Sequence, residues 1–243
     1  MRRLLTLAAL IVATLAVSGA AGPAHAGSGS CSDDGNGNIS CTDQEWVCHG
    51  SVSLVSVTVT ISALTGADGV LLGSGCSGYI GSISVSQASG DGIHVGAFAG
   101  GQSSPLEVGS ASVTCSAHDP GKHQDGIQVL GGSYVNFHQV TVSCLSANDS
   151  QILIHEGAAN QQEPSHVIFT NTTVDPQGTG AYVVSNGLSD SSGFVCLRLL
   201  SDGNLHDLWQ GDGTTNPLWY LRDLPAGTRY NFDPAEFGYC TNA

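Results

Sequence analysis

The sequence Asp68-Gly69-Val70 recurs as Asp91-Gly92-Ile93 and again as Asp125-Gly126-Ile127, at steps of 23 and 34 residues. In each copy a turn leads into a short apolar strand, and a second turn follows. Repeats at irregular steps are typical of the successive coils of a β-solenoid whose loops differ in length. The turn itself has a simpler explanation, because Asp bonds to its own backbone and Gly accepts positive φ.

Two strand types can be followed from coil to coil. The first begins at the Asp-Gly turns, and we expect its inward positions to be Val70, Ile93, Ile127, Ile152 and Tyr182. The second alternates apolar and small polar residues, a period of two that indicates strand. It is found at residues 83–85, 111–115, 140–144 and 167–174, and residues 134–142 align with 166–174 so that Val135 matches Val167.

These patterns predict an all-β fold, a single-stranded parallel β-helix over residues 51–195 with about five to six coils. Parallel strands joined by short turns can only wind around a common axis and stack on the previous coil. A β-sandwich also alternates short strands and turns, but it does not explain the repeated Asp-Gly-apolar turn. Residues 27–50 are expected to be a disulfide-stapled lead-in, and residues 196–243 a cap over the open end.

The chain begins with the features of a bacterial-type export signal. Arg2 and Arg3 form a basic start, residues 4–17 an apolar run, and Ala24-His25-Ala26 a small-x-small cleavage site. We therefore expect residues 1–26 to be removed and the protein to be secreted and extracellular. An even number of cysteines in an exported chain favours disulfides over zinc. The candidates are Cys31, Cys41, Cys48, Cys76, Cys115, Cys144, Cys196 and Cys240.

One cysteine pair tests the winding directly. Cys115 and Cys144 occupy the same slot of neighbouring coils, so their Cα atoms should lie within the roughly 4.4 to 6.8 Å that a disulfide tolerates. Two stacked free thiols would satisfy the same spacing.

Charge narrows the range of partners. The chain has a formal net charge of −14, and without Arg2 and Arg3 four basic residues face 20 acidic ones. Such a surface repels nucleic acid and anionic lipid. It also repels a polyuronate unless a cation intervenes. No later segment is apolar enough to span a membrane.

We expect the protein to be a monomer, with a polysaccharide as its partner.

Together, the Asp-Gly-apolar turns, the aligned strands and the string His123-Gln124-Asp125-Gly126-Ile127-Gln128 make the chain resemble the right-handed parallel β-helix proteins of the pectin-lyase-like superfamily. The resemblance implies a right-handed coil with a substrate groove on the first parallel sheet. The pectate lyase strings Trp-Ile-Asp-His and Arg-x-Pro-x-x-Arg are missing, as are Asn-Thr-Asp and Arg-Ile-Lys of polygalacturonases. No catalytic residue can therefore be carried over from either enzyme family.

The densest polar segment, residues 118–128, provides the candidate site. For β-elimination we expect Lys122 or His123 as the base, with possible Ca²⁺ held by the hard oxygens of Asp91, Asp119 and Asp125. For hydrolysis, Asp125 with Asp91 or with Glu156 would provide two carboxylates. The substrate-binding candidates are His94, Gln128 and His155. We expect Asp91, Asp125 and Ser150 to form a column on the outer face, and His94, Gln128 and Leu153 a second one.

Three functions remain open from the sequence. The first is a lyase or glycoside hydrolase acting on an extracellular polysaccharide around His123 and Asp125. The second is a non-catalytic module that binds a glycan on the same face, and the third is a structural protein of the envelope.

Overall fold

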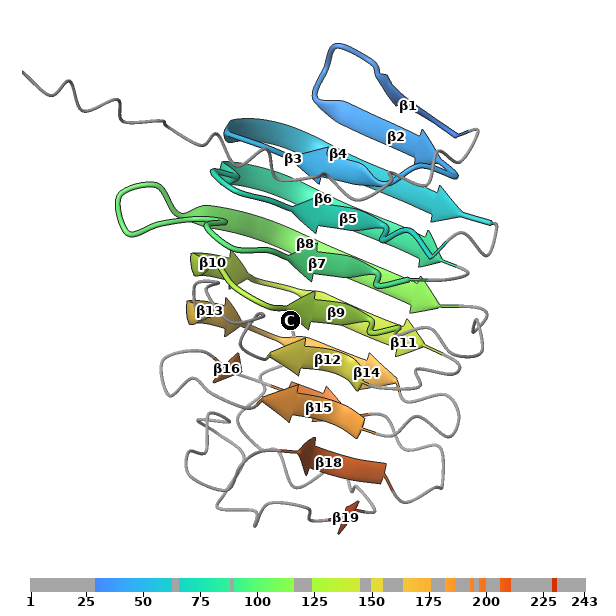
Figure 1. Ribbon diagram of the computed structural model, residues 1–243, viewed down its shortest axis with the longest axis vertical. Coiled ribbons are helices and arrows are strands. Elements are labelled where there is room, and N and C mark those ends of the chain that lie inside the picture. Colours follow the sequence, from blue (N-terminus) through green and yellow to red (C-terminus); the bar gives the residue numbers. More distant parts are fainter. Residues whose placement is uncertain are drawn as a thin grey trace, which may run out of the picture.

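The structure is a computed structural model, and it describes residues 29–62, 66–87, 90–115, 124–144, 150–154 and 164–175, together with the short strands of residues 182–186, 193–194, 197–199, 206–210 and 229–230. Every element in these residues is a strand, and the strands form two sheets (Figure 1). No helix in this part of the chain has the length and apolarity needed to cross a membrane.

The larger sheet, sheet A, has eleven strands. They are β1 (Ser30–Asp33), β2 (Asn38–Thr42), β4 (Ser51–Ile61), β6 (Ser77–Gln87), β8 (Leu106–Cys115), β10 (Ser133–Phe137), β11 (Val140–Cys144), β13 (Ser165–Phe169), β14 (Thr172–Asp175), β16 (Gly193–Phe194) and β17 (Leu197–Leu199).

The smaller sheet, sheet B, has eight strands. They are β3 (Trp46–Cys48), β5 (Val70–Leu72), β7 (Ile93–Val95), β9 (Ile127–Val129), β12 (Ser150–Ile154), β15 (Tyr182–Asn186), β18 (His206–Gln210) and β19 (Arg229–Tyr230).

The chain visits sheet A and sheet B in turn, and each strand pairs in parallel with the strand one coil away. In the later coils the sheet A strand is divided in two, since β8 pairs with both β10 and β11. The exceptions are the antiparallel pairs β1–β2 and β18–β19 near the two ends. The fold is therefore an all-β parallel solenoid, as the sequence predicts. Parallel pairing already begins with β2 and β3, inside the segment expected to be a lead-in, and β17 and β18 continue it beyond residue 195.

The predicted register is confirmed over most of its length. Val70 pairs with Ile93, Ile93 with Ile127 and Ile127 with Ile152. Val135 pairs with Val167, as the alignment of residues 134–142 with 166–174 requires.

The last step of this ladder was predicted wrongly, since Ile152 pairs with Val184 and Tyr182 pairs with Ser150. A shift of two residues keeps every side chain on the same face, so the alternation of apolar residues cannot detect it.

The interior between the sheets is a continuous stack of aliphatic and aromatic side chains. Ile93, Ile127 and Ile152 are fully buried, and the rings of Phe137 and Phe169 stack 4.9 Å apart in adjacent coils. Each coil buries its inward residues against the coils above and below, so the ladder of identical positions is also the hydrophobic core.

The glycines of the Asp-Gly turns serve close approach between coils, which corrects the expectation of positive φ. Gly69, Gly92 and Gly126 are not among the residues of positive φ. A Cβ added to Gly126 would lie 2.5 Å from the backbone oxygen of Gln151, and one on Gly69 would lie 2.6 Å from that of Gly92. Glycine is required because the neighbouring coil occupies the space of a side chain.

Disulfides join Cys31 to Cys41, Cys48 to Cys76 and Cys115 to Cys144, so no cysteine of the described residues is free. Cys115 and Cys144 are bonded with their Cα atoms 4.2 Å apart, slightly closer than the expected range. The alternative of two stacked free thiols is therefore excluded. Cys196 and Cys240 lie outside the described residues. Three disulfides are consistent with an extracellular protein.

Candidate functional site

The aspartates of the Asp-Gly turns form a ladder of hydrogen bonds between coils. The Asp68 carboxylate accepts the backbone N–H of Asp91 at 3.0 Å, Asp91 accepts that of Asp125 at 2.7 Å, and Asp125 accepts that of Ser150 at 2.7 Å. Each carboxylate thus satisfies a backbone donor at the start of the next coil's strand. The repeated Asp is explained first by this structural role.

Two of these aspartates are buried between neighbouring coils of the solenoid. Asp125 is fully buried and Asp91 is 7 % exposed, whereas we had expected an outward column. Both carboxylates are buried because each is bonded to the backbone of the next coil. The second oxygen of Asp125 accepts a hydrogen bond from Nε2 of Gln128 at 3.2 Å. Each oxygen of the Asp125 carboxylate therefore accepts a hydrogen bond.

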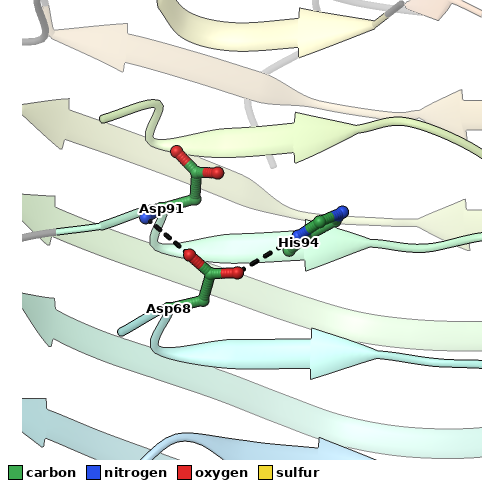
Figure 2. A group of neighbouring side chains, drawn as sticks. All are labelled: Asp68, Asp91 and His94. Atoms are coloured by element: carbon green, nitrogen blue, oxygen red, sulfur yellow. Dashed lines mark hydrogen bonds and ion pairs between the residues drawn. The ribbon is translucent and has the colours of Figure 1, made fainter. Parts of the chain in front are cut away.

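His94 does stand on the outward face of sheet B, in register with Gln128 and Leu153 as predicted. Its Nδ1 lies 3.1 Å from Oδ2 of Asp68, and both side chains are 23 % exposed. Because a carboxylate oxygen can only accept, Nδ1 carries the proton and donates it. Figure 2 shows the Asp68 carboxylate bridging the Asp91 backbone and the His94 ring.

Charge around His94 changes its proton affinity. Burial by itself would lower the pKa of His94, but the hydrogen bond and charge of Asp68, with the charges of Asp91 and Glu45, outweigh it and raise the pKa. Glu45 directly precedes β3, one coil before β5. Burial, followed by the negative charge of Asp68, raises the pKa of Glu45 to about 7, although His94 opposes the shift.

These four residues form what we call the His94 cluster: Glu45, Asp68, Asp91 and His94. It combines a carboxyl group that is partly protonated at neutral pH, a histidine oriented by a carboxylate, and a second carboxylate. Groups whose pKa values are displaced in this way are a common feature of acid–base sites.

The same cluster has the donors for a cation. One ligand atom each from Asp68, Asp91 and His94 lie within 4.8 Å of one another. Two carboxylate oxygens and an imidazole nitrogen suit a transition metal better than Ca²⁺, which prefers oxygen ligands throughout. The expected calcium ligands overlap this set only at Asp91.

Several candidates from the sequence are not placed. Lys122, His123, Asp119, His155 and Glu156 lie outside the described residues, so their roles as base, acid, ligand or substrate contact stay predictions, together with that of Asp125.

Sequence reasoning assigned Asp68 to turn chemistry and did not consider Glu45. Asp68 had a usable signal, because it occupies the same repeat position as Asp91. Glu45 had none, since the segment around it lacks the Asp-Gly turn.

Comparison with known proteins yields no match to this chain, whether among protein-family models, curated proteins or solved structures.

Proposed function

We propose that this protein is secreted and cleaves an extracellular polysaccharide at the His94 cluster. The observation that supports the proposal most is the convergence of ligand atoms of Asp68, Asp91 and His94 within 4.8 Å of one another, at a partly exposed site beside the N-terminal ends of β5 and β7. A place in the pectin-lyase-like superfamily, a right-handed coil and a monomeric state are parts of the same proposal.

Hydrolysis of a neutral glycan fits the cluster better than β-elimination of a uronide. The chain carries a net charge of −14 and the cluster adds three carboxyl groups, so an anionic substrate would be repelled. Glycoside hydrolysis uses one carboxyl group that donates a proton and a second that stays ionised. Glu45, with its raised pKa, takes the role of the proton donor to the leaving oxygen.

His94 and Asp68 would act on the other side of the scissile bond. With Nδ1 held by Asp68, the His94 ring has a fixed orientation and its Nε2 is left to position or deprotonate a water molecule. The Asp91 and Asp68 carboxylates would stabilise the positive charge that develops on the sugar ring. Each step uses groups from neighbouring coils, which the winding brings together.

The test is a digestion screen with the secreted protein. Neutral polysaccharides are incubated and assayed for new reducing ends, and uronides are assayed for unsaturated ends with EDTA, Ca²⁺ or Zn²⁺. Glu45→Gln and His94→Ala should each lower the release of reducing ends at least about a hundredfold.

His138→Ala is the matched control. His138 also pairs with a carboxylate, Glu107, at 2.7 Å, but it stands after β10 on sheet A. Equal activity in all three variants would contradict the assignment. Unsaturated products formed only with a cation would replace hydrolysis by elimination.

A second function, a non-catalytic glycan-binding or structural envelope protein, is favoured by the aspartate ladder. Asp68 and Asp91 each already accept a backbone N–H, so both have a structural reason to be present. A wild-type protein that binds a glycan but releases no ends would support a binding module. A protein that does neither would support a structural role.

A further inference from the structure

The outer surface of sheet A carries a regular grid of hydroxyl groups. Five successive coils contribute the triplets Ser40-Cys41-Thr42, Thr58-Val59-Thr60, Ser84-Val85-Ser86, Ser112-Val113-Thr114 and Thr141-Val142-Ser143. In each triplet the middle residue is buried in the core, and the flanking hydroxyl residues face outward. We call this surface the hydroxyl face.

The triplets stand in exact vertical register. Ser40 pairs with Thr58, Thr58 with Ser84, Ser84 with Ser112 and Ser112 with Thr141, and Thr42 begins a second column through Thr60, Ser86, Thr114 and Ser143. Neighbouring coils are about 4.8 Å apart, and alternate residues of one strand about 6.7 Å apart. The hydroxyl face is therefore a two-column lattice with a fixed spacing in both directions.

The side chains of the face are short and mostly exposed. All its hydroxyl residues are exposed except Ser143, which is half-buried. Thr is also restricted at χ1, so its hydroxyl and methyl groups hold a narrow range of positions above a tightly packed layer. The lattice is held by the core beneath it and does not have to be ordered by a ligand.

The face carries no charge, although the chain has a net charge of −14. No aromatic or charged residue interrupts either column between Ser40 and Ser143. A crystalline glycan is usually held by exposed aromatic rings, and a mineral or an anionic polymer by charges. Without aromatic rings or charges, the hydroxyl face can bind a partner only through its neutral lattice of hydrogen-bond donors and acceptors.

We propose that the hydroxyl face binds crystalline water, that is, the surface of ice. A hydroxyl group both donates and accepts, so each can take the place of one water molecule in a hydrogen-bonded lattice. Hexagonal ice repeats in its basal plane at an interval only slightly shorter than the spacing of stacked β-strands. Water held along each column would then be ordered at nearly the spacing of the crystal, and the neutral face matches the neutral lattice.

The experiment measures incorporation of the secreted protein into slowly growing ice, together with its inhibition of ice recrystallisation. Ser112→Tyr places a bulky ring within the hydroxyl face, on the fourth of its five coils, and should lower both readouts about tenfold, equivalent to about 1.4 kcal/mol of binding free energy. Ser53→Tyr is the matched control, because Ser53 is also an exposed serine but lies on β4 outside the two columns, and it should leave both readouts unchanged.

Thermal melting of both variants checks that the fold is retained. If Ser112→Tyr does not fold, Thr114→Lys is used, because a charge at the edge of the grid should have the same effect. Exclusion of the wild-type protein from ice would overturn the proposal, as would equal behaviour of Ser112→Tyr and Ser53→Tyr. Retention on crystalline cellulose or chitin without incorporation into ice would also overturn it and assign the face to a glycan. Glu45→Gln should leave ice binding intact, so this test is independent of the proposed hydrolysis.

Discussion

The outward column of sheet B changes its chemistry at every coil, whereas the two columns of the hydroxyl face on sheet A repeat the same chemistry. On sheet B the column runs Leu71, His94, Gln128 and Leu153. In the two columns of the hydroxyl face each step is Ser or Thr. Both sheets stack the same coils at the same spacing. Where the residues differ, stacking produces one localised cluster, and where they agree it produces a repeating surface.

The two surfaces also differ in what lies behind them. The His94 cluster is joined to the wall of the solenoid by the aspartate ladder, so changes there should affect both stability and chemistry. In the hydroxyl face, the buried residues between the two columns pack in the core, and the outward hydroxyl side chains do not. Substitutions on it should therefore leave stability almost unchanged.

The largest effect is expected where sheet B approaches the next coil. Gly126→Ala places a methyl group 2.5 Å from the backbone oxygen of Gln151, so we expect a loss of about 3 kcal/mol of unfolding free energy. Gly96→Ala is the control, because its Cβ meets nothing closer than 3.5 Å. It should be neutral or stabilising by about 0.5 kcal/mol. Urea unfolding measures both, and equal losses would show that the coils are not packed as described.

The next effect compares the contributions of the aspartate ladder and of the hydroxyl face to the free energy of unfolding. Asp125→Ala removes the acceptor of the Ser150 N–H and of the Gln128 amide, both buried, and should lower the free energy of unfolding by about 2 kcal/mol. Thr141→Ala, on the hydroxyl face, should change it by less than about 0.5 kcal/mol. The comparison fails if Thr141→Ala is as damaging as Asp125→Ala in the same urea titration.

A smaller effect is expected from pH. The pKa of Glu45 rises from the ordinary 4.5 to about 7 on folding, so between these values the folded state binds more protons than the unfolded state. The contribution of Glu45 to stability is present below pH 4.5 and is lost as the pH rises through 7. Because Glu45 is partly solvated, the loss should be about 1 kcal/mol.

The pH effect is measured as the difference between the wild type and Glu45→Gln in unfolding free energy at pH 4.5 and at pH 8. The variant should lack this part of the pH dependence. Parallel curves for the two proteins would mean that the Glu45 carboxyl is not buried against Asp68.

The smallest effect is a change in the pKa of His94. Asp68→Asn removes the charge that holds up the pKa of His94, and burial then acts without it, so the His94 ring should titrate at lower pH. The titration is followed by NMR of the imidazole protons. Glu107→Gln, which alters a carboxylate on sheet A, should leave the His94 titration unchanged. A shift of the same size in both variants would contradict a local cause.

Much of the fold could be predicted because the same sequence pattern recurs in successive coils of a solenoid. Val70, Ile93 and Ile127 are each preceded by an Asp-Gly pair, and Ile152 continues their spacing, which fixes the register. The step to Tyr182 was misplaced by two residues because alternation fixes the face of a residue but not its position along the strand.

The candidate site was predicted less completely. Asp91 and His94 were included, but Asp91 and Asp125 are buried and not exposed, because each carboxylate is bonded to the backbone of the next coil. Glu45 reaches the cluster through the pairing of β3 with β5, which depends on a segment that has no repeat. A residue brought close only by such a pairing leaves no mark in the sequence.

Successive coils stack in register, and the pairing of the cysteines reports on this stacking. Proteolytic digestion of the oxidised, secreted protein without reduction, followed by mass spectrometry, identifies each linked pair of cysteines. Stacking in register predicts a fragment joining Cys115 to Cys144, with separate links from Cys31 to Cys41 and from Cys48 to Cys76. A link from Cys115 to any cysteine other than Cys144 would contradict the winding on which both surfaces depend.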